Sequence, residues 1–158
     1  MRVLLQRVSE ASVSVDGAVI GSIDAGLLLL VGFTNGDSVN ATRRVIDKAL
    51  DLRIFEDQNG RMNLSFRDQV SGSVNRSGIL LVSQFTLYAD TRRGRRPSFT
   101  DSADPDVARD LFDQAVSHIR DQGIRCAAGQ FGAHMRVHLI NDGPVTIWLD
   151  SADLSNST

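Results

Sequence analysis

Short apolar runs broken by turn residues follow one another along this chain, a pattern typical of β-strands. The first run covers residues 2–15, and Asp16-Gly17 separates it from a second run at residues 18–23. Asp-Gly between two β-rich runs is a strong hairpin signal, because its φ angles can become positive. The chain is therefore predicted to open with a β-hairpin.

Two segments have the apolar spacing of amphipathic helices instead. The first follows a turn in which Asp37 or Ser38 can act as the N-cap. The second begins at Ser102 or Asp104, with a proline near its first position, and ends at Gly123. The apolar positions of the first are Val39, Ile46, Ala49 and Leu50, and those of the second are Ala108, Leu111, Phe112, Ala115 and Ile119.

The remaining apolar runs predict further strands. Leu27–Val31 indicates a central strand, Asn59-Gly60 marks a second hairpin, and another strand begins at Ile79 after a Gly/Ser-rich loop at residues 69–78. The runs between residues 124 and 150 supply the closing strands. Together these elements predict an α+β fold, in which two main helices pack on an antiparallel-rich, β-barrel-like sheet.

The length and composition are those of an ordinary globular protein. The chain has 158 residues, 42% of them hydrophobic and 23% charged, and a formal net charge of −2. This length predicts a single domain, over residues 1–150, followed by a polar tail at residues 151–158. A mildly acidic chain is not expected to bind nucleic acid over its whole surface, so such a partner would need a local basic patch.

We expect no membrane-spanning segment, no secretory signal and no intrachain disulfide from this sequence. No apolar run approaches the roughly 20 residues that cross a bilayer, so we expect no membrane association. The first residues lack the apolar stretch of a secretory signal, which predicts a cytoplasmic protein. The single cysteine, Cys126, has no intrachain partner and is expected to be a buried thiol.

The histidines do not favour metal or conventional serine chemistry. His118 borders the apolar stripe of the second helix, where packing is a commoner role than catalysis. His134 and His138 are four residues apart on a predicted strand, roughly 13 Å, so they cannot share one metal ion without a bend. Ser83 lacks the G-x-S-x-G turn of α/β-hydrolases. We therefore predict no metal and no cofactor.

A polar segment, Ser-Gln-Phe-Thr at residues 83–86, directly follows the strand that begins at Ile79. Backbone N–H groups at such a strand end can stabilise an oxyanion during acyl transfer without a dedicated base. Four arginines follow, and they suggest a ligand that carries phosphate, although a solvated loop would have the same composition. They are Arg92, Arg93, Arg95 and Arg96.

A second unusual segment, Asn-Asp-Gly-Pro-Val-Thr at residues 141–146, lies between two predicted strands. Proline is excluded from strand interiors, and the bond before proline is the one at which a cis peptide is cheap. Gly143-Pro144 is therefore compatible with an ordinary turn and with a sharp cis turn that exposes backbone carbonyls.

Taken together, several segments resemble the D-aminoacyl-tRNA deacylase family over nearly the whole chain, from Met1 to about Asp150. Two paired motifs, Ser83-Gln84-x-Thr86 and Asn141-x-Gly143-Pro144-x-Thr146, carry most of its specificity. The loop at 66–78 is longer than usual in the family, and the tail after Asp150 is additional. The segments are QRV at 6–8, MNL at 62–64, SQFTLYAD at 83–90, RGRRPSF at 93–99 and NDGPVT at 141–146.

The resemblance implies a homodimer with its active site at the subunit interface. It implies hydrolysis of the ester that joins a D-amino acid to tRNA, a proofreading reaction in translation, and similar action on glycyl-tRNA mischarged on tRNA(Ala). The partner subunit's Gly-cis-Pro turn would hold the α-amino group and collide with an L-side chain. The substrate's ribose 2′-hydroxyl would assist the reaction.

The family's site residues can be transferred to matching positions of this sequence. Ser83, Gln84, Phe85 and Thr86 would form the catalytic pocket, with backbone N–H groups near Phe85 and Thr86 facing the scissile carbonyl. Thr86 as a covalent nucleophile is the alternative mechanism. Arg7 would help to hold the turn. Substrate binding and L-rejection are implied for Gly143, Pro144, Arg7, Met135, Asn141 and Thr146.

Two alternatives come from other functional classes. One is an RNA-binding dimer with this fold and no turnover, and the other is a Ser/Thr hydrolase of small esters unrelated to tRNA. The intact motifs at residues 83–86 and 143–144 argue against the first alternative.

Overall fold

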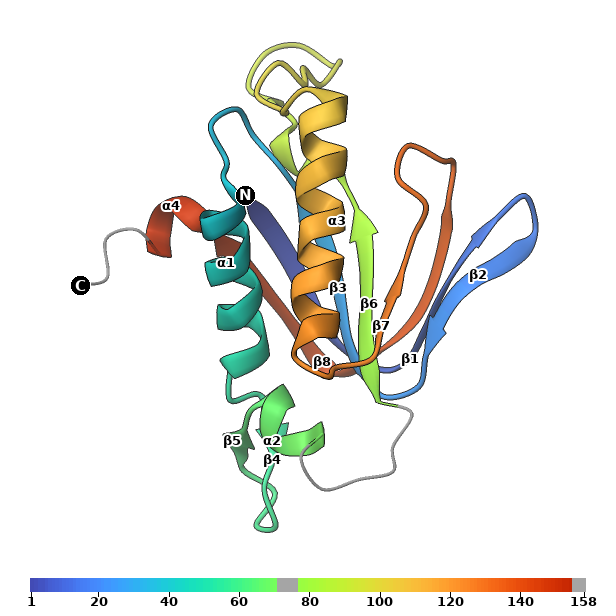
Figure 1. Ribbon diagram of the computed structural model, residues 1–158, viewed down its shortest axis with the longest axis vertical. Coiled ribbons are helices and arrows are strands. Elements are labelled where there is room, and N and C mark those ends of the chain that lie inside the picture. The colour runs from blue at the N-terminus through green and yellow to red at the C-terminus, as the bar shows by residue number, and fades with distance from the viewer. Residues whose placement is uncertain (71–76, 155–158) are drawn as a thin grey trace.

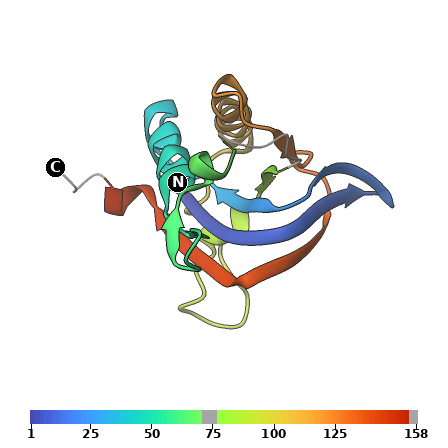
Figure 2. The ribbon, with the colours of Figure 1, turned by 90° about the horizontal axis from the view of Figure 1, so that it is seen from below.

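The computed structural model of the chain describes residues 1–70 and 77–154, and it contains a strongly curved sheet with two long helices (Figure 1). The view turned by 90° places both helices, α1 and α3, on the same side of the sheet (Figure 2). The predicted α+β class is confirmed. In chain order the elements are β1 (Arg2–Val15), β2 (Ala18–Ile23), β3 (Gly26–Gly32), α1 (Val39–Asp51), β4 (Phe55–Glu56), β5 (Met62–Leu64), α2 (Phe66–Val70), β6 (Gly78–Ser83), the 3₁₀ helix η1 (Phe85–Tyr88), α3 (Pro105–Asp121), β7 (Cys126–Ala128), β8 (Arg136–Asp150) and α4 (Ser151–Leu154).

The order of the strands makes the sheet a nearly closed barrel, as predicted. It runs β2-β1-β3-β6-β7, and β8 pairs with the other edge of β1. The long strand β1 pairs with β3 through its first half and with β2 through its second half. The ends of the sheet approach where β2 passes β7, because a Cβ added to Gly21 would lie 3.1 Å from the carbonyl oxygen of Ala128.

Strand directions are more mixed than predicted. β1 pairs antiparallel with β2, β3 and β8, whereas β3–β6 and β6–β7 are parallel pairs. Helix α1 lies between β3 and β6 in the chain, and α3 lies between β6 and β7. Parallel neighbours require crossovers of this kind. The apolar pattern reports burial but not strand direction, which is why it could not separate the two arrangements.

Apolar side chains cover both faces of the central strands. Leu27 and Leu29 of β3 pack toward the helices, whereas Leu28 belongs to a second cluster with Leu80 of β6 and Val13 of β1. Successive strand residues point to opposite faces, so a strand buried on both sides is continuously apolar. The predicted central strand at Leu27–Val31 is therefore confirmed, and β3 and β6 are both almost fully buried up to the segments that follow them.

The predicted turn and cap signals also appear in the structure. Asp16 and Gly17 have φ angles of 50° and 83°, which closes the β1–β2 hairpin. The Ser38 hydroxyl accepts a hydrogen bond from the Ala41 N–H at 3.2 Å and caps α1. Asp104 caps α3 in the same way. These features depend on neighbouring residues alone, so the sequence could predict them.

Part of the predicted loop at residues 66–78 is helical. Phe66–Val70 forms α2, and the side chains of Ser65 and Asp68 cap its start reciprocally: the Ser65 N–H donates to the Asp68 carboxylate at 2.7 Å, and the Asp68 N–H donates to the Ser65 hydroxyl at 3.2 Å. This is a capping box, a signal that the Gly/Ser-rich interpretation overlooked. The rest of that predicted loop, residues 71–76, lies outside the described residues.

The C-terminal segments differ from the sequence prediction in two further respects. Strand β8 continues from Arg136 to Asp150 through the expected turn, which is a bulge within one strand and not a connection between two. Residues Ser151–Leu154 of the predicted polar tail form the short helix α4, and Leu154 packs against the core. Residues 155–158 lie outside the described part of the chain.

Cys126 is buried, as predicted, and burial raises the pKa of its thiol to about 11. Of the helices in the described residues, none is long and apolar enough to cross a membrane.

Candidate active site

The Ser83–Thr86 segment is positioned by the end of strand β6. The Gln84 N–H donates to the carbonyl oxygen of Val31 on β3 at 2.7 Å, and the 3₁₀ helix η1 begins at the next residue. The backbones approach closely here, since a Cβ on Gly32 would lie 2.8 Å from the Gln84 carbonyl oxygen. Gly32 therefore permits this placement. A glycine inside a strand signals such close approach, and this signal could have identified Gly32 from the sequence.

Two adjacent backbone donors are unpaired at this point. The N–H groups of Phe85 and Thr86 open η1, and neither has an acceptor within residues 1–70 and 77–154. The first N–H groups of any helix lack intrahelical acceptors, so they must bind side chains, water or a ligand. Thr86 accepts a hydrogen bond on its hydroxyl from the Gln84 side-chain amide, and Ser102 donates to the Phe85 carbonyl at 3.2 Å.

A cavity of about 730 Å³ lies beside this segment. Ser83, Gln84, Phe85 and Met135 line it, so the structure brings these four predicted residues together, whereas Thr86 is not part of the lining. The rest of the wall is mainly apolar, a composition typical of small-molecule sites. Residues that the sequence analysis did not assign to the site include Val31, Phe33, Phe99, Ser102, Ala108, Phe131 and His134.

The histidines are not arranged as general bases for the two hydroxyls. His118 pairs with Asp47 at 3.0 Å between α1 and α3, and His138 pairs with Glu10 at 3.0 Å. His134 lines the cavity but is exposed to solvent. Among the described residues, neither Ser83 nor Thr86 forms a hydrogen bond to a histidine or carboxylate. No cluster of three or more metal-ligating side chains occurs among them either.

The second motif forms a bulge in the middle of β8. Gln6 pairs with Thr146 and Val8 with Asn141, so residues 142–145 are accommodated opposite Arg7 alone. The Asn141 side-chain amide closes this bulge by donating to the carbonyl oxygens of Arg7 and Val145, both at 3.0 Å. Its oxygen accepts from the Thr146 hydroxyl at 3.2 Å. These bonds explain why the motif has its polar side chains at both ends.

Arg7 braces the bulge from inside the protein. Its guanidinium donates to the Ile54 carbonyl at 2.5 Å and to the Asp142 carbonyl at 3.3 Å, and it forms an ion pair with the Asp142 carboxylate at 3.1 Å. The Arg7 side chain is almost fully buried. Gly143 has a φ of +116°, and a Cβ there would lie 2.7 Å from the guanidinium. Only glycine fits this position without moving Arg7.

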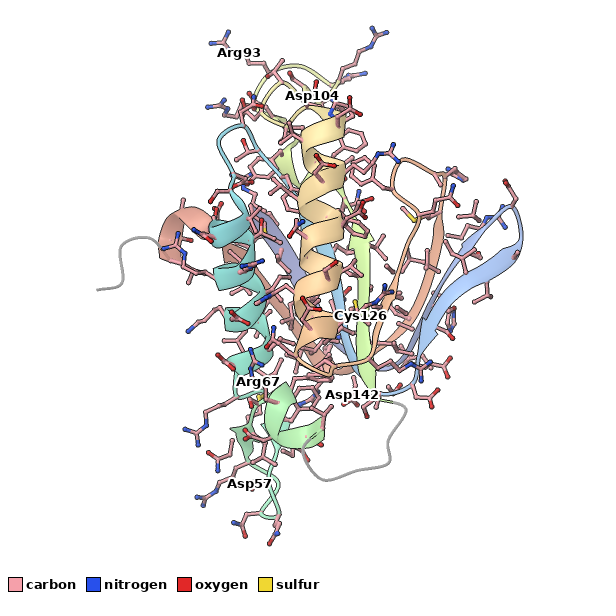
Figure 3. The ribbon with its side chains drawn as sticks, in the orientation of Figure 1. Asp57, Arg67, Arg93, Asp104, Cys126 and Asp142 are labelled. Atoms are coloured by element: carbon pink, nitrogen blue, oxygen red, sulfur yellow. The ribbon has the colours of Figure 1, made fainter. Side chains whose placement is uncertain are left out.

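Gly143 and Pro144 are exposed at the tip of the bulge, and the peptide bond between them is cis, as the resemblance implies. In Figure 3, Asp142 of the bulge lies near the lower end of the sheet, whereas Asp104, beside the cavity, lies at the upper end. A separate hollow of about 360 Å³ adjoins the bulge, with Arg7, Asp142 and Gly143 among its lining residues.

Within one chain, the motif at residues 83–86 therefore lies far from the motif at residues 141–146. Ser83 pairs with Val31 where β6 runs beside β3. Arg7, which lies opposite the bulge, pairs with Leu27 where β1 runs beside β3. Four residues along β3 correspond to roughly 13 Å. Strands β1 and β3 also lie between β8 and β6. One chain brings together the residues of each motif, but it does not bring the two motifs together.

One of the four predicted tRNA-binding arginines, Arg92, is neutralised by an ion pair with Asp90. Arg92 donates to both carboxylate oxygens of Asp90 at 2.8 Å, and these bonds hold the pKa of Asp90 at about 2. Within the described residues, Arg93, Arg95 and Arg96 have no hydrogen-bond or ion-pair partner and are exposed. The tip of this loop projects at the upper end of the molecule, where Arg93 is labelled in Figure 3.

Comparisons with known proteins identify the family. Residues 4–150 match the family described as D-Tyr-tRNA(Tyr) deacylase. The chain belongs to this family. It is 56% identical to a D-aminoacyl-tRNA deacylase from Thermomicrobium roseum over 98% of this chain and 96% of that protein. A solved structure titled c-Myc DNA Unwinding Element Binding Protein is 35% identical, with a TM-score of 0.85 over 95% of this chain and 98% of that one.

A more distant structure supports the fold of this deacylase-family chain. A probable eukaryotic D-amino acid tRNA deacylase is 20% identical and superposes with a TM-score of 0.80 over 94% of this chain and 97% of that one. The predicted family is thus confirmed, and the barrel-like architecture is shared with solved structures.

Proposed function

We propose that this protein hydrolyses the ester bond of D-aminoacyl-tRNA and releases the free D-amino acid and tRNA. The observation that carries the proposal is the pair of unpaired N–H groups, Phe85 and Thr86, beside a cavity large enough for an aminoacyl-adenosine. Membership of the deacylase family supplies the substrate class. The protein would act in translation as a proofreading hydrolase.

The two N–H groups would stabilise the negative charge that develops on the scissile carbonyl oxygen. Preorganised donors of this kind are often the largest single contribution to acyl-transfer catalysis. Water adds to the carbonyl carbon, the bond from that carbon to the ribose oxygen breaks, and the ribose oxygen takes up a proton. The neighbouring ribose 2′-hydroxyl assists this proton transfer. The absence of a base hydrogen-bonded to Ser83 or Thr86, within the described residues, favours this route over a covalent intermediate.

Selection against L-amino acids would come from a second subunit in a homodimer. The exposed Gly143-Pro144 tip cannot reach the Ser83–Thr86 segment of its own chain, because roughly 13 Å along the strands and two intervening strands separate them. In a two-fold dimer each tip would enter the partner's cavity. Its carbonyl groups would hold the α-amino group, so that an L-side chain collides with the turn while a D-side chain points away. Glycine has no side chain to reject, so glycyl-tRNA mischarged on tRNA(Ala) would also be cleaved.

Substrate-binding roles follow for the residues around these two segments. Met135 and Gln84 line the cavity, whereas Arg7, Asn141 and Thr146 act by holding the turn. The exposed Arg93, Arg95 and Arg96 would contact tRNA phosphates.

The decisive experiment compares D-Tyr-tRNA, L-Tyr-tRNA and a simple tyrosine ester as substrates for the purified protein. We expect release of tyrosine from D-Tyr-tRNA, with little from the L-form or the simple ester. Binding of tRNA without release of tyrosine would indicate the RNA-binding alternative. Equal turnover of the simple ester would indicate a general hydrolase.

Thr86→Ala tests the mechanism separately from the substrate. We expect this variant to retain measurable deacylation, because the proposed contribution of Thr86 is its backbone N–H, which alanine keeps. Complete loss of activity in a folded variant, together with an acylated Thr86 trapped in the unsubstituted protein, would instead establish covalent catalysis.

A further inference from the structure

We propose that the rings of Phe85 and Phe99 form a stacking site for the nucleobase that precedes the terminal adenosine of the tRNA. This inference rests on the proposed function. The ring centroids are 5.0 Å apart, with an interplanar angle of 67°, so the two rings support each other edge to face. The residues are nevertheless 58% and 37% exposed. An ordered aromatic pair with free ring surface is suited to receive a flat ligand.

The pair lies between the cavity and the arginine loop. Both phenylalanines line the cavity. Phe99 also follows directly after the loop of residues 90–98, which Asp90 and Ser98 close by two reciprocal backbone hydrogen bonds of 2.8 and 2.9 Å. A nucleotide chain that leaves the cavity toward the arginines of this loop would therefore pass over the rings.

The position of Phe85 relates this surface to the reacting ester. The same residue contributes one of the two unpaired N–H groups, and Ser102 holds its carbonyl by a hydrogen bond of 3.2 Å. If the ester carbonyl binds at the N–H group, the terminal adenosine occupies the cavity. The next nucleotide is then the first one outside it, at the level of the exposed rings.

A nucleobase fits these two rings better than the same rings of a second copy do, a contact different from the entry of the partner's Gly143-Pro144 tip into the cavity. Base stacking on aromatic rings tolerates any base, as an enzyme that accepts many tRNAs requires. The neighbouring Arg93, Arg95 and Arg96 are unpaired within the described residues and suit the phosphates on either side of that base. Two copies meeting at this surface would instead bring two such arginine loops together, and like charges facing each other oppose association.

The test uses substrates that differ by one nucleotide, with Phe99 as the substituted residue because its backbone has no assigned role. The substrates are D-tyrosyl-adenosine, D-tyrosyl-cytidylyl-adenosine and D-Tyr-tRNA. We expect Phe99→Ala and Phe99→Leu to raise KM for the dinucleotide and tRNA substrates roughly 5- to 150-fold, the range for loss of one base stack. Because Phe99 also lines the cavity, KM for D-tyrosyl-adenosine can rise too, but by a smaller factor than KM for the two longer substrates. Phe99→Trp should restore the KM for the longer substrates.

Three results would overturn the stacking site. One is an equal loss with all three substrates, which would make Phe99 a packing residue of the cavity. Another is unchanged KM values in Phe99→Ala and Phe99→Leu. The third is a change in sedimentation behaviour with no difference between substrates, which would assign the rings to contact between chains. If the unsubstituted protein cleaves none of the substrates, the proposed function fails; if it cleaves all three and only the Phe99 prediction fails, the proposed function stands.

Discussion

The two motif segments of this protein are held in opposite ways. Ser83–Thr86 is positioned by its main chain: the Gln84 N–H bonds to Val31, and the backbone of Gly32 lies close beneath it. The bulge at residues 141–146 is positioned by side chains, chiefly those of Asn141 and Arg7. The first segment leaves N–H groups unpaired beside a cavity, whereas the second leaves its main chain exposed on a projection.

Under the proposed mechanism, this difference explains why neither segment would be a complete site. A concave surface with unpaired donors lacks an element that reads the configuration of the substrate. The bulge at residues 141–146 does not border the cavity beside Ser83–Thr86 of its own chain. The hollow next to this bulge is a different one. One surface is concave and the other projects, and in the proposed dimer two chains would combine them. The following predictions test that relation, from the largest expected effect to the smallest.

Mixing two variants of strongly reduced activity should restore part of the lost activity. Gly32→Ala damages the concave segment, and Gly143→Ala damages the projection. Random exchange of subunits at equal concentrations makes about half of the dimers mixed, each with one intact site of two, so about a quarter of the unsubstituted activity should return. Deacylation is measured before and after dissociation and reassociation, and each variant treated alone is the control. Activity that does not rise above these controls would show that the site does not combine two chains.

Gly32→Ala alone should reduce kcat far more than it reduces stability. The added Cβ would lie 2.8 Å from the Gln84 carbonyl and 3.2 Å from Leu87 Cβ, so residues 84–87 must move. A displacement of about 1 Å at a catalytic group can cost about 100-fold in rate. Single-turnover kinetics and thermal unfolding separate the two effects. Gly21→Ala is the matched control, because its Cβ contact of 3.1 Å with Ala128 lies outside the cavity; an equal rate loss in both variants would contradict the prediction.

Arg7→Met should act mainly on stability and chiral selection. Methionine removes the donor to the Ile54 carbonyl, and a buried acceptor without a partner costs about 1–3 kcal/mol. At about 2–4 °C per kcal/mol for a chain of this size, Tm should fall by about 2–12 °C. The loosened projection should also increase cleavage of L-Tyr-tRNA relative to D-Tyr-tRNA. Asp142→Asn, which removes only the ion pair, should have a smaller effect on both measurements. If folded Arg7→Met cleaves D-Tyr-tRNA and L-Tyr-tRNA in the same ratio as the unsubstituted protein, Arg7 has no role in chiral selection.

Replacing Arg93, Arg95 and Arg96 by Gln should flatten the salt dependence of tRNA binding. Each lost phosphate contact lowers the slope of log K against log salt by roughly 0.7–0.9. Binding of a non-hydrolysable amide analogue of D-aminoacyl-tRNA at several salt concentrations measures this slope. The control is the double variant Asp90→Asn, Arg92→Gln, which removes an already neutralised pair and should change the slope little. Equal slopes in the unsubstituted protein, the triple variant and the control would show that these arginines are solvated and do not contact tRNA phosphates.

Several elements were predictable because neighbouring residues determine them. The Asp16-Gly17 hairpin, the Ser38 cap of α1 and the apolar stripe of α3 depend on local backbone preferences and on burial. The motifs at residues 83–86 and 141–146 identified the family correctly. Helix α2 was also encoded locally, by the capping box of Ser65 and Asp68, although the Gly/Ser-rich context hid that signal.

Other properties arose only when distant segments came together. The parallel pairing of β3 with β6, the near-closure of the barrel at Gly21 and the hydrogen bond from Arg7 to the Ile54 carbonyl are not visible in apolar periodicity or in a charge pattern. The same applies to the unpaired N–H groups of Phe85 and Thr86, since a donor is free only if no part of the fold supplies an acceptor. The sequence by itself determined the elements and the family. Tertiary structure decided which polar groups are satisfied and that the two motifs lie apart, because both depend on contacts between residues far apart in the chain.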